Sequence, residues 1–138
     1  STSINSNIVS FQKWLNENYA SSLSVDGSFG KLTRGAAVKA LQTYLNKTYN
    51  LSLSVDGSFG PITKAAMQDN KIWVKKGDKN DLVFILQGLL YCRSYDPKGF
   101  DGEFGSNTET AVRAYQGDKS LTKDGEAGAA TFAALCAA

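Results

Sequence analysis

The stretch Asp101-Gly102-Glu103-Phe104-Gly105 decides how this chain folds, because the same turn recurs three more times. The other copies are Asp26-Gly27-Ser28-Phe29-Gly30, Asp56-Gly57-Ser58-Phe59-Gly60 and Asp124-Gly125-Glu126-Ala127-Gly128. Three residues after the last glycine a threonine follows each time, at Thr33, Thr63, Thr108 and Thr131. Glycine permits the positive φ of a tight turn, and aspartate can accept hydrogen bonds from nearby backbone amides. Four equivalent copies predict scaffolding turns rather than four ligand sites.

A longer period of 75 residues relates the two parts of the chain: it separates Gln12 from Gln87 and Asp26 from Asp101. The fourth turn follows the second by only 68 residues, so the first part carries about seven extra residues between its turns. We therefore expect two homologous halves, 1–70 and 71–138. No Gly/Ser-rich or Pro-rich linker separates them, which favours a fixed contact between the halves. Trp73, at the junction, is expected to be a packing residue.

Apolar residues recur at helical spacing between the turns. In the second half the apolar face comprises Leu82, Ile85, Leu86, Leu89 and Leu90, and in the first half Ile4, Ile8, Phe11 and Leu15. Each half is thus expected to run helix, turn, helix, turn, helix. The fold class predicted is all-α, with two three-helix bundles and with Phe29, Phe59 and Phe104 filling the core from the turns.

The expected helix starts carry recognisable capping residues. Asn5 or Ser6 can cap the first helix, and Asp78, Asn80 or Asp81 can cap the first helix of the second half. Gly60-Pro61 suits an N-cap followed by proline at the first helical position. Ser106-x-x-Glu109 fits a capping box.

Composition excludes several classes of catalytic and metal site. The chain has 138 residues, 42% of them hydrophobic, and no histidine, which removes Ser-His-Asp and Cys-His catalysis and imidazole zinc sites. Two cysteines cannot build an all-thiolate zinc site, and the acidic spacing of an EF-hand is missing. Glycoside hydrolysis needs a specific carboxylate pair, whereas the turn aspartates are repeated four times. We expect no cofactor, no metal ligand and no catalytic residue.

Charge and hydropathy exclude two kinds of partner. A net charge of +2 is not the basic footprint of a nucleic-acid-binding protein. No apolar run approaches the ~18–20 residues that cross a bilayer, so no membrane span is expected. The chain begins with Ser1 rather than methionine, and we expect it to be cut from a longer protein. Cys92 and Cys136 could form a disulfide or remain buried thiols, and we favour the thiols.

Residues 75–136 resemble the peptidoglycan-binding-domain-like family. The resemblance opens with Gly77-Asp78-x-x-Asp81-x-Val83 and Leu86-Gln87-x-Leu89-Leu90 and continues with Phe100-Asp101-Gly102-x-Phe104-Gly105-x-x-Thr108. It closes with Leu121-x-x-Asp124-Gly125-x-x-Gly128-x-x-Thr131-x-x-x-Leu135. The first half looks like a diverged copy, which lacks the Gly-Asp opening and has Leu41-Gln42 in place of Tyr115-Gln116, one residue out of step.

The resemblance implies a non-catalytic region that binds bacterial peptidoglycan and targets a peptidoglycan hydrolase, such as an endolysin or autolysin, to the cell wall. Location would be extracellular, at the wall, and a phage lysin would first be made in the host cytoplasm. Lysine- and asparagine-rich usage hints at a Gram-positive setting. The alternative is a protein-interaction or regulatory module that packs on its parent catalytic domain, and a weaker one is a lytic enzyme in its own right.

Candidate ligand-binding residues follow from what peptidoglycan presents: N-acetyl sugars, peptide amides and carboxylates. In the second half they are expected at helix ends or exposed helix positions, and Trp14 is expected to be partly exposed in the first half. Arg93 and Arg113 could pair with a stem-peptide carboxylate. The complete set is Tyr91, Arg93, Tyr95, Arg113, Gln116 and Trp14. Two weak sites in one chain would raise avidity by ~10²–10⁴ if both engage at once.

Overall fold

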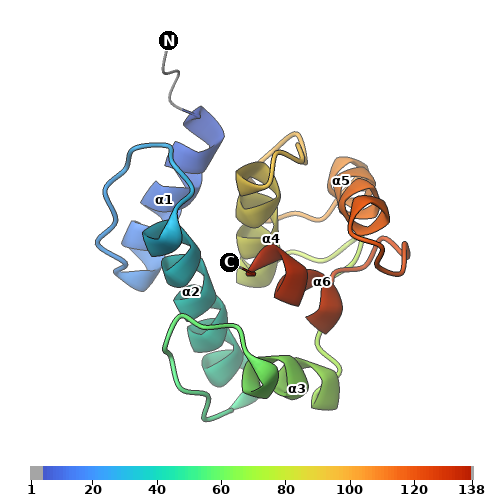
Figure 1. Cartoon of the computed structure of the whole chain (residues 1–138), viewed down its shortest axis with the longest axis horizontal. Helices are drawn as coiled ribbons and strands as arrows, with labels where there is room; N and C mark the ends of the chain where they lie inside the picture. Colours follow the sequence, from blue (N-terminus) through green and yellow to red (C-terminus); the bar gives the residue numbers. More distant parts are fainter. Residues whose placement is uncertain (1–4, 138) are drawn as a thin grey trace.

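Helices account for the regular structure of the chain. The computed structural model describes residues 5–137, and Figure 1 shows its helices in chain order. They are α1 (Ser6–Tyr19), α2 (Lys31–Tyr49), α3 (Pro61–Asp69), α4 (Asp81–Cys92), α5 (Ser106–Asp118) and α6 (Ala129–Leu135). Within residues 5–137 the extended pairing is limited to two isolated bridges, Val74 with Ala127 and Lys79 with Glu103. The predicted all-α class is confirmed. Ile4 lies outside the described residues.

Helix starts agree with most of the expected caps. The Asn5 side chain accepts from the amides of Asn7 and Ile8 at the start of α1, and the Asn80 side chain accepts from Val83 N at the start of α4. Gly60 caps α3, with Pro61 as the first helical residue. The Asn5 and Asn80 side chains satisfy amides that the first turn of a helix leaves without a partner.

The predicted capping box at Ser106 is wrong. Gly105 is the N-cap of α5, with extended backbone (φ −106°, ψ −166°), so Ser106 already lies inside the helix. A capping box needs serine at the N-cap position itself. The last glycine of the turn is the N-cap of α2, α3 and α6 as well. The next helix therefore begins immediately after the last glycine of each turn.

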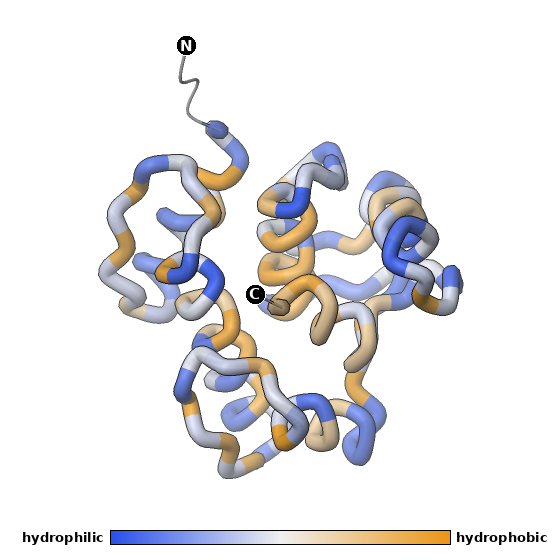
Figure 2. The backbone as a smooth tube through the Cα atoms, viewed as in Figure 1, coloured by the Kyte–Doolittle hydropathy of each residue, from blue (hydrophilic) through white to orange (hydrophobic). Residues whose placement is uncertain are grey.

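The hydrophobic core is continuous through both halves. Helix α4 lies at its centre and packs against α1 and α2 of the first half as well as α5 and α6 of the second. Figure 2 shows hydrophobic colouring over much of α4, and nearly all residues from Leu82 to Tyr91 are buried, which fits a helix enclosed on several sides. Fully buried residues of both halves, among them Leu41 and Leu86, belong to one cluster. The separate two-bundle arrangement is not confirmed.

Aromatic contacts hold the two halves together. Trp14 of α1 stacks on Phe84 of α4 with ring centroids 5.0 Å apart, and Phe84 meets Phe100 edge-on at 5.1 Å. Tyr19 at the end of α1 donates its hydroxyl proton to Asp81 Oδ2 at 2.7 Å. Burial beside the Asp81 carboxylate raises the pKa of Tyr19 far above its usual range, so it remains a donor. The expected contact between the halves is therefore present.

The junction between the halves is itself fastened to the third and fourth turns. Val74 and Ala127 exchange two backbone hydrogen bonds, at 2.9 and 2.8 Å. Gly77 N donates to the Phe104 carbonyl, and Phe104 N donates to the Asp78 carbonyl. Trp73 is 46% exposed, so the expectation that it serves as a packing residue is wrong. Its neighbours in sequence, Ile72 and Val74, are the buried ones, because the extended junction alternates its side chains between inside and outside.

Candidate functional site

Each Asp-Gly turn is organised around a buried glutamine on the helix that precedes it. In the first turn the Gln12 amide nitrogen donates to Asp26 Oδ1 at 2.9 Å, to the Ser28 carbonyl at 3.1 Å and to Thr33 Oγ1 at 3.0 Å. Its amide oxygen accepts from the backbone N–H groups of Asp26 and Gly27 at 3.0 and 2.9 Å. One side chain thus ties together a helix, the turn and the start of the next helix.

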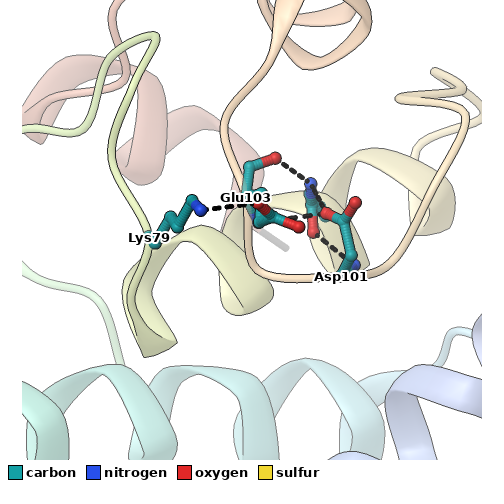
Figure 3. A network of polar contacts seen from close by, with 4 residues as sticks. Lys79, Asp101 and Glu103 are labelled. Carbon is teal, nitrogen blue, oxygen red and sulfur yellow. Dashed lines mark hydrogen bonds and ion pairs between the residues drawn. The ribbon is translucent and has the colours of Figure 1, made fainter.

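The arrangement recurs at the other turns, with Gln42, Gln87 and Gln116 in the place of Gln12, although the Gln116 oxygen accepts from the Gly125 N–H alone. All four glutamines are at most 1% exposed. Figure 3 shows the third turn, where Asp101 and Glu103 lie within this network and Lys79 pairs with Glu103 at 3.0 Å. That ion pair is exposed and contributes little to stability. Within residues 5–137 no buried side-chain polar atom lacks a partner, so the networks are complete.

The sequence offers a signal for these glutamines that the predictions did not use. Glutamine precedes the turn aspartate by 14 residues in the first three turns and by 8 in the fourth. In the first half Asn16 and Asn46 lie one helical turn further on. Each exchanges two hydrogen bonds with a loop leucine seven residues later, Leu23 and Leu53 respectively. Those longer loops are therefore held by a second side chain.

Electrostatics gives the turn aspartates a structural role. Hydrogen bonds lower the pKa of Asp26, Asp56 and Asp101 below the usual value, chiefly from the Gln12 amide for Asp26 and from the backbone N–H two residues on for the other two. A glycosidase acid needs the opposite, a carboxyl whose pKa is raised so that it stays protonated. These carboxylates accept hydrogen bonds and remain ionised at neutral pH.

Two of the predicted ligand-binding residues are buried. Gln116 is 1% exposed, and its amide bonds Asp124, the Glu126 carbonyl and Thr131, so no part of it is offered to a ligand. Tyr91, in the last turn of α4, is 8% exposed, and burial is the main reason that its pKa is raised. Both positions lie near helix ends, where sequence alone does not distinguish a buried side chain from an exposed one.

Arg93 and Trp14 hold the fold together from partly exposed positions. The Arg93 guanidinium donates to the Leu135 carbonyl at 3.1 and 2.8 Å and to the Ala137 carbonyl, and it lies over the Phe29 ring, 5.1 Å from the centroid. It therefore closes the end of α6 against the first half. Trp14 is half-buried, as expected, but its ring faces Phe84.

Tyr95 and Arg113 lie at the surface of the second half without forming a common site. The Tyr95 hydroxyl donates to Asp118 Oδ2 at 2.6 Å, and this bond is the main cause of its raised pKa. Arg113 donates to the Lys123 carbonyl at 2.9 Å and covers the fourth turn. Arg113 is exposed, whereas Tyr95 is half-buried, with its ring edge-on to Tyr115 at 5.1 Å.

A groove of about 500 Å³ lies in the first half. Its walls are the loop after α1, the first turns of α2 and the second Asp-Gly turn. Three cations line it, Lys31, Arg34 and Lys39, and they face a serine-rich loop with Ser21, Ser22 and Ser24. Asp56 lines the same groove, and the Lys39 charge contributes to lowering its pKa. The groove thus combines positive charge with hydroxyl groups, a chemistry suited to carboxylates or phosphates.

Two smaller hollows adjoin the second and fourth turns. One, of about 240 Å³, lies between the second turn and the start of α3 and is lined by Ser54, Asp56, Ser58 and Ile62. The other, of about 410 Å³, lies between α3 and α6 and includes Trp73 and Glu126. Asp56 is shared by the 500 Å³ and 240 Å³ grooves, so these two hollows meet at the second turn.

The described residues hold no cluster of three metal-ligating side chains, and Cys92 and Cys136 are free thiols. Burial raises the pKa of both thiols to about 12, which removes the thiolate needed for nucleophilic or metal chemistry near neutral pH. No helix in the described part of the chain is long and apolar enough to cross a bilayer.

Comparison with known proteins points to the bacterial cell wall. A family model described as "Putative peptidoglycan binding domain" matches residues 34–69 and 79–135. The first segment runs from the first turn of α2 to the end of α3, and the second covers α4, α5 and α6. The matched segments lie on either side of the junction, as expected of tandem copies.

Two relatives come from Bacillus subtilis strain 168. The uncharacterized protein FadG is 35% identical to this chain over 130 residues, which cover 90% of this chain and 22% of FadG. The uncharacterized protein YbfG is 44% identical over 43 residues, which cover 31% of this chain and 6% of YbfG. The chain therefore spans under a quarter of the length of either relative. No solved structure matches it.

Proposed function

Because this chain belongs to the peptidoglycan binding domain family, we propose that it is a non-catalytic region that holds a peptidoglycan hydrolase, such as an endolysin or autolysin, on the bacterial wall. The observation that carries the proposal is the family match on both sides of the junction. The wall of a Gram-positive bacterium is the expected place of action, in line with the two Bacillus relatives.

The networks around the turns support a binding role over a catalytic one. Asp26, Asp56 and Asp101 are the repeated carboxylates that acid–base chemistry could use. In each, Oδ1 already accepts hydrogen bonds from a glutamine amide and from a backbone N–H. Their lowered pKa values are the wrong direction for a general acid. In this proposal, a separate catalytic domain of the parent enzyme cleaves peptidoglycan.

Rigid attachment of the halves has a consequence for avidity. Two flexibly linked modules search for ligands independently, whereas a fixed pair engages two ligand units only where their separation matches. The contacts of Trp14 with Phe84 and of Tyr19 with Asp81 keep the two halves in one orientation. Of the residues predicted from sequence to bind ligand, Arg113 is exposed and Tyr95 is partly exposed at the surface of the second half. We therefore include these two residues in the proposed binding surface.

Co-sedimentation with purified sacculi tests the proposal directly. The chain should appear in the pellet with intact sacculi, and the turbidity of the suspension should stay constant over hours. A chain that remains in the supernatant at every salt concentration contradicts wall binding. A fall in turbidity contradicts the non-catalytic assignment. Tight binding to the parent's catalytic domain, with none to sacculi, would instead support the regulatory alternative.

A further inference from the structure

Exposed apolar side chains are concentrated in the first half. Leu32 is 81% exposed and Ile62 is 77% exposed, each at the second position of its helix, and Val25 and Val55 are 39% and 45% exposed. The members of each pair lie 30 residues apart. Large apolar residues exposed to this degree, in two equivalent places, indicate a surface that another molecule covers.

The repeated surface extends beyond what the turn requires. Residues 23–30 and 53–60 share the same eight letters, Leu-Ser-Val-Asp-Gly-Ser-Phe-Gly. The third and fourth turns keep the aspartate and glycines but have Phe100 and Lys123 where the first two have valine. The exposed valines are therefore not needed to form a turn.

A charged groove lies beside the first of these apolar places. Lys31, Arg34 and Lys39 line the 500 Å³ groove, and none of the three forms an ion pair with another of the residues 5–137. The groove also contains Leu32, and the adjoining 240 Å³ hollow contains Ile62. Asp56 lines both hollows, and we call the two hollows together the α2 track.

The second half has no free copy of this surface. At the third turn the counterpart of Val25 is Phe100, whose ring is half-buried against Phe11, Trp14 and Phe84. The counterpart of Leu32 is Asn107, which is polar. Docking of the first half thus partly covers Phe100 at the third turn, whereas Val25 and Val55 at the first two turns are exposed.

We propose that the α2 track, rather than the second half, is the main ligand-binding site, and that it takes the stem peptide of peptidoglycan. The proposal rests on the wall-binding function above. Carboxylates of the peptide would pair with Lys31, Arg34 and Lys39, and its small alanine side chains would pack against Leu32 and Ile62. A peptide that carries both carboxylates and methyl groups matches a surface that has both cations and apolar side chains.

Charge removal in the α2 track is the first test. The variant Lys31→Gln/Arg34→Gln/Lys39→Gln is compared with Lys13→Gln/Lys47→Gln/Lys76→Gln, which removes three exposed lysines outside both hollows. The two variants have the same net charge, so a general attraction to anionic sacculi weakens equally in both. On sacculi stripped of teichoic acids, we expect affinity about tenfold or more below wild type for the track variant and within about twofold for the control.

Removal of the apolar contacts is the second test. Leu32→Ser/Ile62→Ser should weaken binding severalfold while leaving the urea midpoint unchanged, because both side chains are already exposed. Tyr49→Ser, at an exposed apolar residue that lines neither hollow, is the matched control and should bind as wild type does. A soluble stem peptide with free carboxylates should compete with sacculi, and its amidated form should compete less.

The outcomes separate the inference from the function on which it rests. If wild type binds stripped sacculi no better than the track variant does, the α2 track is not the main binding site, but the proposal of wall binding is unaffected. Wild type that binds intact but not stripped sacculi assigns the cations to wall phosphates and overturns the stem-peptide ligand. The stem-peptide ligand is also overturned if Leu32→Ser/Ile62→Ser abolishes self-association of the chain, or its binding to the parent catalytic domain, while the soluble stem peptide does not compete with sacculi. Absence of all sacculus binding overturns both proposals.

Discussion

The ring of Phe11 on α1 packs against Gly88 on α4 so closely that a Cβ atom at position 88 would lie 2.2 Å from Phe11 Cδ1. Both residues are buried, Phe11 completely. Helix propensity disfavours glycine inside a helix, so its presence there has a packing reason. At this point α1 of the first half packs tightly against α4, the central helix of the second half.

Gly88→Ala should destabilise the whole chain. The added methyl group overlaps Phe11, and overpacking of this kind costs about 1–3 kcal/mol, more than the ~1 kcal/mol that alanine gains in helix propensity. Urea unfolding should show one cooperative transition at a lower midpoint. Gly35→Ala in α2 is the control, since nothing lies within 4 Å of its added Cβ. That variant should be as stable as wild type or about 0.5–1 kcal/mol more stable, and equal losses in both would contradict the packing argument.

Gln87→Ala should open the third turn. The change leaves the Asp101 carboxylate, the Gly102 amide and the Thr108 hydroxyl without their common partner. Loss of a buried hydrogen-bonding group costs about 1–3 kcal/mol, and more than one group is affected here. We expect a free energy of unfolding lower by about 3 kcal/mol, measured in urea. Gln68→Ala, at an exposed position of α3, should change it by under ~0.5 kcal/mol.

Acid should weaken the turns through their aspartates. The pKa values of Asp26, Asp56 and Asp101 lie below 3.8 in the folded chain. A folded pKa below the unfolded one gives stability that is present above the unfolded value and is lost as pH falls through the folded value. The urea midpoint should therefore fall as pH drops below about 4.

The neutral variant Asp26→Asn/Asp56→Asn/Asp101→Asn provides the comparison. Asparagine keeps the accepting Oδ1 but has no proton to gain, so the urea midpoint of this variant should depend less on pH between about 5 and 2 than that of wild type. Parallel pH profiles for the two proteins would show that other carboxylates cause the acid loss.

The two thiols should resist alkylation in the folded chain. With pKa values of about 12 rather than 9.0, Cys92 and Cys136 carry about a thousandfold less thiolate at pH 8 than unperturbed cysteines. Iodoacetamide should label neither thiol under native conditions and both in urea, as mass spectrometry would show. Reducing agent should leave the urea midpoint unchanged, and a midpoint that drops on reduction would indicate a disulfide.

Local features were predictable from sequence because they depend on residues close together in the chain. The helix starts at Asn5, Asn80 and Gly60 follow from capping chemistry within a few residues, and apolar spacing indicated the helices. The error at Ser106 was also local, since glycine and serine both suit an N-cap and only the backbone conformation selects between them.

Site residues were harder to predict, because burial depends on what lies opposite a side chain. Gln116 and Tyr91 have polar groups and lie near helix ends, yet both are buried, Gln116 with its amide bonded to the fourth turn. Trp14 faces Phe84, 70 residues away along the chain. Lys31, Arg34 and Lys39 went unnoticed, since nothing in their spacing shows that a loop and a turn will close a groove around them.

By itself, the sequence determined an all-helical chain of repeated Asp-Gly turns, its family and the scaffolding role of the aspartates, because those properties follow from short-range geometry and from recurrence. Only the tertiary structure decided that α4 would be shared by both halves, that Phe100 would be covered and that Leu32 would stay exposed. Equivalent positions in the two halves have similar neighbours along the chain. Their exposure differs because the surfaces that pack against the two halves are different.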